Sequence, residues 1–216
     1  SMDFLDVLAD IAPDAVAQSA YNVAIVVNEA SEDSRTVAAH YARVRGVPES
    51  NIIRINTSTD EAIDRTTYVE TIERPLGQAI SRAGLQDRLL YLVLTKGIPL
   101  RITGTVGTAG TAASVDSELT LLYRRLTGTA APPSGLIDNP YFLGARNLSE
   151  AKPFSHREHD IYLVTRLDGF TTADALALID RAPRARPAGI VVLDQRAAPE
   201  SSRIGDEWMA RAAERL

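Results

Sequence analysis

Five short apolar runs, each rich in Val, Ile or Leu, are spread along the chain. They cover residues 23–27, 52–55, 89–94, 161–164 and 190–193. Most of them do not alternate with polar residues, which is typical of strands that are covered on both faces. The pattern therefore predicts a mostly parallel sheet with helices on each side of it.

Helical patterns lie between most of these runs. Ser31 is a typical N-cap, and Gly46 would end that helix. One helical face would carry the apolar side chains of Val37, Ala38, Tyr41 and Ala42. After the second run, Thr67 and Glu70 have the spacing of a capping box. Strands that alternate with capped helices predict βαβ units with right-handed crossovers.

The second and third helices carry further signals. An apolar stripe runs through residues 69–83 and contains Pro75, which predicts a kink. Thr171 or Thr172 would cap a helix after the fourth run. We therefore predict an α/β fold, a three-layer α/β/α sandwich with a mostly parallel sheet, and expect a flavodoxin-like strand order of 2-1-3-4-5.

A long insertion, residues 97–159, separates the third and fourth runs and is far longer than a plain crossover. Its first part, residues 98–102, would extend the sheet or form a small edge strand. Residues 103–113 are mostly Thr, Gly and Ala, so we expect them to be mobile, and Ser114 would cap a helix. Residues 127–140 have the composition of a loop. Because loops carry function, the insertion is where we expect it.

Composition excludes several classes of protein. The chain has 216 residues, 45% of them hydrophobic, with no cysteine and a formal net charge of −5. The lack of cysteine excludes disulfides, thiolate metal sites and a cysteine nucleophile. The acidic balance argues against a nucleic-acid partner, which normally needs a basic face. No apolar run approaches the ~20 residues of a membrane span, so we expect a soluble protein.

One α/β domain is expected over residues 1–216, because this length fits a single core. Residues 206–216 have the apolar spacing of a helix, and no glycine or proline ends it. We therefore expect the natural protein to continue beyond Leu216 and this domain to be part of it. The sequence predicts no particular oligomeric state.

The strongest site candidates follow the predicted strands. In open parallel sheets the carboxyl ends of the strands share one edge, and ligands bind there. We call this edge, with the loops that follow it, the rim. The candidates for catalysis are Lys96, Asp168 and Glu29. The candidates for ligand binding on the strands are Asn28, Ser31, Thr95 and Arg166.

A lysine and two acids on one rim could bind an anionic or polyhydroxy ligand, or perform acid–base chemistry. With neighbouring strands about 4.8 Å apart, we expect Glu29, Lys96 and Asp168 to converge. The alternative is that strand ends are polar in every such fold, and that Lys96 forms a structural ion pair with Glu29.

Two further ligand-binding candidates, Asp116 and Ser117, lie in the first turn of the predicted insertion helix. Asp116 would approach the rim if the insertion folds back, or would only complement the helix dipole. The glycines at 104, 107 and 110 precede this helix, but the Lys-Ser/Thr of a phosphate-binding P-loop is missing. We therefore predict a flexible lid here and no cofactor.

A metal site and a serine triad are both disfavoured. His156, His159 and Asp160 have the spacing of half a metal site, but they precede the fourth strand and so would lie opposite the rim. We predict no metal there. No G-x-S-x-G motif is present, and no histidine follows a predicted strand.

Five segments together resemble a known family. They are residues 22–31, 41–52, 90–99 (LYLVLTKGIP), 113–119 (ASVDSEL) and 162–169 (YLVTRLDG). They resemble an uncharacterised family of conserved hypothetical bacterial proteins, found in genomes that encode the PEP-CTERM/exosortase sorting system. The likeness covers residues 22 to about 210. It implies an exported or envelope-associated setting and a longer protein, but it implies no activity, cofactor or catalytic residue.

A more distant similarity is to the caspase–gingipain sandwich, which also has a parallel sheet with an active rim. That activity needs a histidine and a cysteine after adjacent strands, and this chain has neither there. The sequence thus leaves two hypotheses. One is an enzyme, hydrolase-like, or a ligand-binding domain, acting on a small anionic or glycan ligand at the rim. The other is a non-catalytic binding or scaffolding module of a larger envelope-associated protein.

Overall fold

The computed structural model describes residues 18–104, 112–129, 139–144, 146–186, 192–193 and 203–214. The chain forms two compact units, Ser1–Pro183 and Arg184–Leu216. The first unit contains the parallel sheet and every predicted site residue, so the description concentrates on it.

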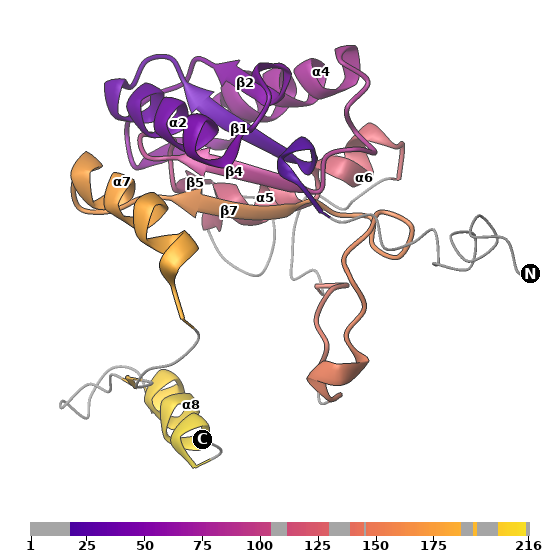
Figure 1. Cartoon of the computed structure of the whole chain (residues 1–216), viewed down its shortest axis with the longest axis vertical. Helices are drawn as coiled ribbons and strands as arrows, with labels where there is room; N and C mark the ends of the chain where they lie inside the picture. The colour runs from indigo at the N-terminus through magenta and orange to yellow at the C-terminus, as the bar shows by residue number, and fades with distance from the viewer. Residues whose placement is uncertain are drawn as a thin grey trace, which may run out of the picture. The chain divides into compact units, whose positions relative to one another are not determined.

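Four parallel strands form the main sheet (Figure 1). They are β1 (Val23–Asn28), β2 (Ile52–Ile55), β4 (Tyr91–Thr95) and β7 (Leu163–Leu167), in the order β2-β1-β4-β7. They correspond to the first four apolar runs, so the parallel sheet and the first four places of the expected order are confirmed. The fifth run, residues 190–193, lies largely outside the described residues.

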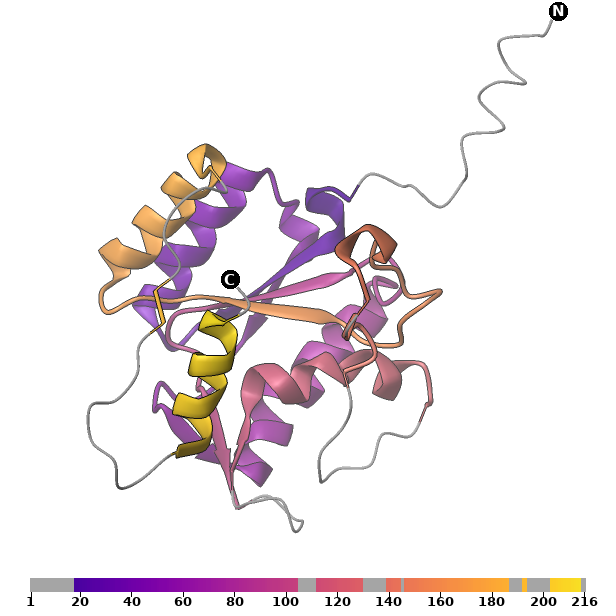
Figure 2. The same ribbon diagram turned by 90° about the horizontal axis from the view of Figure 1, so that it is seen from below.

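Helices lie on both faces of this sheet (Figure 2). On one face α2 (Glu32–Arg45) and α7 (Thr172–Arg181) lie side by side, and Ile25 and Val27 of β1 pack toward Ala38 of α2. On the other face are α4 (Arg74–Arg82), α5 (Val115–Thr120) and α6 (Leu122–Leu126). Ala24 and Val26 of β1 belong to the core on that side, because successive strand residues point to opposite faces.

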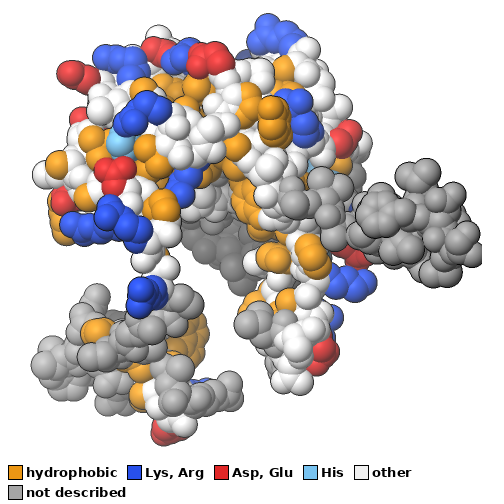
Figure 3. Space-filling model, in the orientation of Figure 1, with side chains coloured by type: hydrophobic (Ala, Val, Ile, Leu, Met, Phe, Trp, Pro, Cys, Tyr) orange, Lys and Arg blue, Asp and Glu red, His pale blue; other side chains and the backbone are white. Residues whose placement is uncertain are grey.

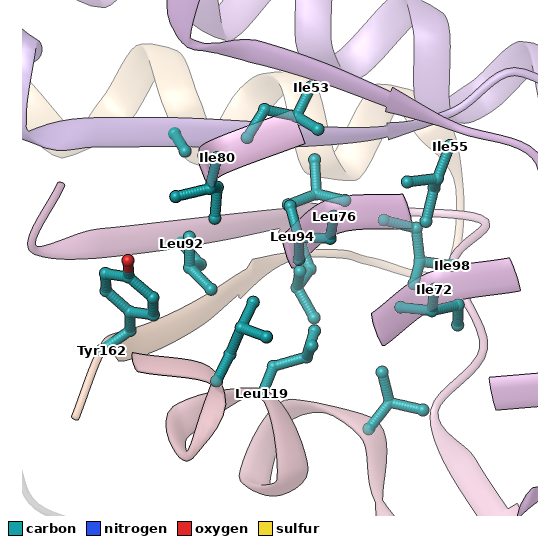
Figure 4. Packing of buried hydrophobic residues seen from close by; sticks show 14 of the residues in the cluster. Ile53, Ile55, Ile72, Leu76, Ile80, Leu92, Leu94, Ile98, Leu119 and Tyr162 are labelled. Carbon is teal, nitrogen blue, oxygen red and sulfur yellow. The ribbon is translucent and has the colours of Figure 1, made fainter. Parts of the chain in front are cut away.

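The larger core lies between the sheet and the second group of helices (Figure 4). Side chains of two strands meet side chains of two helices there. They are Ile53 and Ile55 of β2, Leu92 and Leu94 of β4, Leu76 and Ile80 of α4, and Leu119 of α5. The predicted stripe of residues 69–83 supplies the buried face of α4, so that interpretation is confirmed.

The helix before α4 begins earlier than predicted. It runs through α3 (Arg65–Tyr68) and a π-helical segment, η3 (Val69–Glu73), directly into α4. Asp64 is the N-cap and accepts the N–H of Thr67 at 2.8 Å, so the capping box expected at Thr67 is wrong. The π segment ends at Glu73, two residues before Pro75, which has no N–H for a regular helical bond. The disturbance expected from this proline therefore takes the form of a widened turn.

A second, small sheet has the order β3-β5-β6. It consists of β3 (Ala62–Asp64), β5 (Arg101–Thr103) and β6 (Ala112–Ser114), with β3 and β5 parallel and β5 and β6 antiparallel. The edge strand predicted at 98–102 exists, but it joins this sheet rather than the main one. β3 and β6 were not predicted, because three residues are too few to give a period.

Short 3₁₀ turns complete the description: η1 (Ala20–Asn22), η2 (Glu49–Asn51), η4 (Leu148–Glu150) and η5 (Ala182–Arg184). The second unit contains α8 (Arg203–Ala213), which overlaps the helix predicted at 206–216. Among the described helices, none has the length and apolar character that crossing a membrane requires. On the face drawn in Figure 3, acidic and basic side chains are interspersed.

Candidate functional site

The site residues predicted on the strands lie at the rim, and three of them belong to the strands themselves. Asn28 is the last residue of β1, Thr95 the last of β4, and Arg166 the penultimate residue of β7. The pairing of Asn28 with Ile55 and of Thr95 with Leu167 extends the ladders further than the apolar runs indicate. The pleat of the sheet therefore fixes where these side chains point.

Asn28 is buried and ties three segments together. Its Oδ1 accepts the N–H groups of Ala30 at 3.1 Å and Thr57 at 3.2 Å. Its Nδ2 donates to the carbonyls of Gly97 at 2.8 Å and Ser58 at 3.3 Å. Each side-chain donor and acceptor of Asn28 is thus used inside the protein, which a buried amide requires.

Thr95 belongs to a buried chain of hydrogen bonds. The N–H of Asn28 donates to Ser34 Oγ at 2.7 Å, and the hydroxyls of Ser34 and Thr95 are 2.6 Å apart. Thr95 Oγ1 lies 2.8 Å from the carbonyl oxygen of Val26. Because a carbonyl only accepts, Thr95 donates to Val26 and Ser34 donates to Thr95. Both hydroxyl protons are engaged, so neither group has a proton left to donate to a ligand.

Ser31 and Gly97 meet at the start of α2. Ser31 is the N-cap, and its Oγ accepts the N–H of Ser34 at 3.2 Å, as the sequence predicts. Gly97 has φ +90°, and a Cβ added there would lie 2.1 Å from Ser31 Oγ. This position therefore needs glycine for two reasons, its left-handed backbone and its contact with the cap.

Lys96 and Asp168 form an ion pair. Lys96 Nζ lies 3.1 Å from Asp168 Oδ1 and donates to the carbonyl of Gly169 at 2.7 Å. The same Asp168 oxygen accepts the N–H of Gly169 at 2.8 Å. The Lys96 side chain is 20% exposed and that of Asp168 is 34% exposed. The predicted convergence of Lys96 and Asp168 is thus present in the structure.

Arg166 and Asp116 form a second, bidentate pair. Arg166 Nε and Nη2 lie 3.1 and 2.5 Å from the two carboxylate oxygens of Asp116. The same guanidinium donates to the carbonyls of Ile98 at 2.7 Å and Pro99 at 3.0 Å. Only 10% of the Arg166 side chain is exposed. Helix α5 of the insertion thus lies against β7, and Asp116 meets Arg166 there.

Glu29 and Ser117 have other roles than those expected. Glu29 pairs with Arg54 at 2.9 Å, and Arg54 also holds Glu49 at 2.9 Å. The alternative ion pair between Lys96 and Glu29 therefore does not form. Ser117 is exposed and contributes its backbone N–H, 3.4 Å from Ser114 Oγ, to the cap of α5.

The histidines near the fourth strand take part in an aromatic cluster. His156 stacks on Tyr123, with ring centroids 3.8 Å apart and planes 3° apart. Its Nε2 lies 2.5 Å from the carbonyl of Leu89, while Tyr123 donates to Asp87 at 2.8 Å. Burial, followed by that hydrogen bond, raises the pKa of Tyr123 to about 12. In the described part of the chain, no three His, Asp or Glu residues are grouped to hold a metal ion.

Sequence reasoning missed a charge network beside the small sheet. Glu118 pairs with Arg65 at 3.0 Å and with Arg125 at 3.1 Å, and Arg125 also contacts Glu73. The first turn of α5 thus holds two acids with different partners, Asp116 at the rim and Glu118 in this network. From the sequence, both acids could complement the dipole of this helix. Only the fold shows that they have different ion-pair partners.

The charged candidates of the rim, Lys96, Asp168, Arg166 and Asp116, are therefore paired with one another. The Lys96 ammonium has three protons, two of which already have acceptors. Asp168 and Asp116 are each neutralised by a cation at hydrogen-bond distance.

Comparison with known proteins adds no relative. No protein-family model matches this chain, and neither the curated proteins nor the solved structures contain a match.

Replacing Gly97 with Ala should destabilise the fold by about 3 kcal/mol or more, because the new methyl group would collide with the α2 cap and strain the backbone. Gly84→Ala is the matched control, since Gly84 has φ +62° and no atom within 4 Å of an added Cβ. It should cost only about 1–2 kcal/mol, the backbone strain alone. Urea unfolding measures both, and equal losses would contradict a close contact at Gly97.

Replacing Asp174 with Asn should reduce the acid sensitivity of the fold. Asp174 completes the capping box of α7, and hydrogen bonds from Thr171 lower its pKa, with weaker help from Arg181 and Lys96. A carboxylate with a lowered pKa stabilises the folded state above about pH 4, and this stability is lost as the pH falls through the folded pKa.

The measurement is the free energy of unfolding between pH 7 and pH 2. The wild type should lose stability more steeply below pH 4 than Asp174→Asn, while Glu70→Gln, on an exposed glutamate, should keep the wild-type slope. Identical slopes for all three proteins would show that protonation of Asp174 does not change the free energy of unfolding.

Proposed function

We propose that this chain is a non-catalytic binding module, and that its rim is a structural latch rather than an active site. The observation that carries the proposal is the pairing of the candidate groups: Lys96 with Asp168, and Arg166 with Asp116. A general acid or base needs a proton that can be exchanged with substrate, and a nucleophile needs an unpaired lone pair. Groups held by internal partners serve neither purpose well.

The latch connects the insertion to the sheet at two points. Lys96 lies at the point where the chain leaves β4, and Asp168 directly follows β7. Arg166 of β7 holds α5 through Asp116. Both pairs therefore join the beginning of the insertion to the strand at which the chain returns.

We also propose the finer architecture. Helices on both faces and the order β2-β1-β4-β7 support a flavodoxin-like three-layer sandwich. The five resembling segments support membership of the uncharacterised bacterial family and a place in a larger envelope-associated protein. In that setting a binding or scaffolding role fits a rim whose charged side chains pair with one another.

A hydrolase-like enzyme or ligand site at the rim is the second candidate. One observation favours it: Lys96 retains one ammonium proton without an acceptor among the described residues, and its side chain is partly exposed. An anionic or glycan oxygen could accept that proton. A ligand bound in this way would compete with Asp168 for the lysine.

A double-mutant cycle on Lys96 and Asp168 tests the proposal. Lys96→Met and Asp168→Asn should each lower the free energy of unfolding, with a coupling energy of about 0.5–1 kcal/mol, because the pair is partly exposed to solvent. Lys152→Met is the control: Lys152 is the other lysine of the chain, and it pairs with Glu158 at 3.9 Å with 73% of its side chain exposed. It should leave stability unchanged.

The enzyme hypothesis makes the opposite forecast. Under it, Lys96→Met leaves stability unchanged but abolishes a thermal shift produced by phosphate esters or oligosaccharides in the wild type. That combination would overturn the latch.

A further inference from the structure

A groove of about 590 Å³ lies on the side of the molecule that carries α4 and α6, between η3–α4 and α6. Its volume falls within the range of small-molecule sites, about 300–1,000 Å³. It contains none of the predicted rim residues.

The floor of the groove is apolar. Val69 comes from the π segment, and Leu122 and Leu126 come from α6. Gly77 of α4 allows the two helices to approach, since an added Cβ would lie 3.2 Å from Leu126 Cδ2 and 3.4 Å from Leu122 Cδ1. This floor can bury the apolar part of a ligand, at about 25 cal/mol per Å² of apolar surface removed from water.

One edge of the groove is cationic. Arg74 and Arg82 of α4 line it, with the polar side chains of Gln78 and Ser81 between them. Among the described residues, Arg74 has no hydrogen-bond or ion-pair partner, and Arg82 donates only to the carbonyl of Gln78 at 3.2 Å. Two helical turns, about 12 Å, separate these arginines along α4. An anion between them would be within reach of both long side chains.

Glu73, the acid that lines the groove, does not pair with either of these arginines. Glu73 lines the groove, but it contacts Arg125, which also pairs with Glu118. Arg65 completes that network at 3.0 Å from Glu118. Two glutamates and two arginines thus balance each other, which leaves the charges of Arg74 and Arg82 for a ligand.

Two further features mark this place. The wall that carries Val69 and Glu73 is a π-helical segment, a rare conformation that often occurs at functional sites. Tyr68, directly before it, is fully buried, and its hydroxyl has no hydrogen-bond partner in the described part of the protein. Buried polar groups without a partner are uncommon in folded proteins.

We propose that the groove between η3–α4 and α6 binds an amphiphilic anion, whose apolar body lies on Val69, Leu122 and Leu126 and whose carboxylate or phosphate is held by Arg74 and Arg82. The inference rests on the proposed function, because it names the surface through which a non-catalytic module binds. Arginine suits both head groups, since its planar fork donates two parallel hydrogen bonds to either. An acidic peptide is the alternative occupant, and the ligand series below separates the two.

The test is a titration of the whole chain with decanoate and with octyl phosphate below their micelle concentrations, followed by calorimetry and NMR. We expect saturable binding of at least one of them, with amide shifts centred on residues 69–82 and 122–126. Inorganic phosphate lacks the apolar body, and 1-decanol lacks the charge, so each should bind at least about tenfold more weakly. An acidic hexapeptide without apolar residues should not compete.

The double variant Arg74→Gln/Arg82→Gln should raise the Kd of the bound amphiphile at least about tenfold. Arg101→Gln/Arg181→Gln is the matched control, because these exposed arginines on β5 and α7 do not line the groove. It should leave the Kd within about twofold.

Five results would overturn the inference: no binding of either amphiphile, equal binding of 1-decanol, competition by the acidic hexapeptide, shifts centred elsewhere such as on α8, or equal effects of the two double variants. None of them bears on the Lys96–Asp168 cycle. A missing coupling in that cycle would reject the latch and leave the groove measurements as they are, so the two failures are distinguishable.

Discussion

The guanidinium of Arg166 is the constraint on which the arrangement of the first unit depends. It is nearly buried, and it binds both carboxylate oxygens of Asp116 and the carbonyls of Ile98 and Pro99. The chain leaves the main sheet after β4 and returns to it at β7. One side chain of the returning strand therefore holds the departing segment and helix α5 at once. A buried cation of this kind is tolerated only when several acceptors surround it.

Other polar groups of the rim also have their partners inside the protein. The Asn28 amide forms hydrogen bonds with three segments, and the hydroxyls of Ser34 and Thr95 donate hydrogen bonds in a buried chain. Lys96 and Asp168 neutralise each other beside them. The polar groups at the carboxyl ends of the strands thus support the turns that follow.

Much of the fold could be predicted from the sequence because its signals are local. Ser31 and Thr171 cap the helices expected of them, Gly46 ends α2 with φ 66°, and the long apolar runs become the parallel strands. Short elements could not be predicted, since β3 has only three residues and Asp64, rather than Thr67, caps the helix that follows.

The contacts among the candidate residues were predicted in part. Parallel topology brings Lys96 to Asp168 and places Arg166 near the insertion, and both follow from the strand order. The choice of partner depends on residues distant in sequence, such as Arg54 for Glu29 and Arg125 for Glu118. The groove has no local signature either, because it arises only where Gly77 lets α4 approach α6.

The most direct test of the latch is a double-mutant cycle on the stronger pair, with Arg166→Met, Asp116→Asn and the combined variant compared by urea unfolding. The account predicts a coupling energy of about 1–3 kcal/mol, because either single change leaves a poorly hydrated charge without its partner. Single effects that add to within about 0.3 kcal/mol would contradict it, since they would mean that Arg166 and Asp116 stabilise the protein independently of each other.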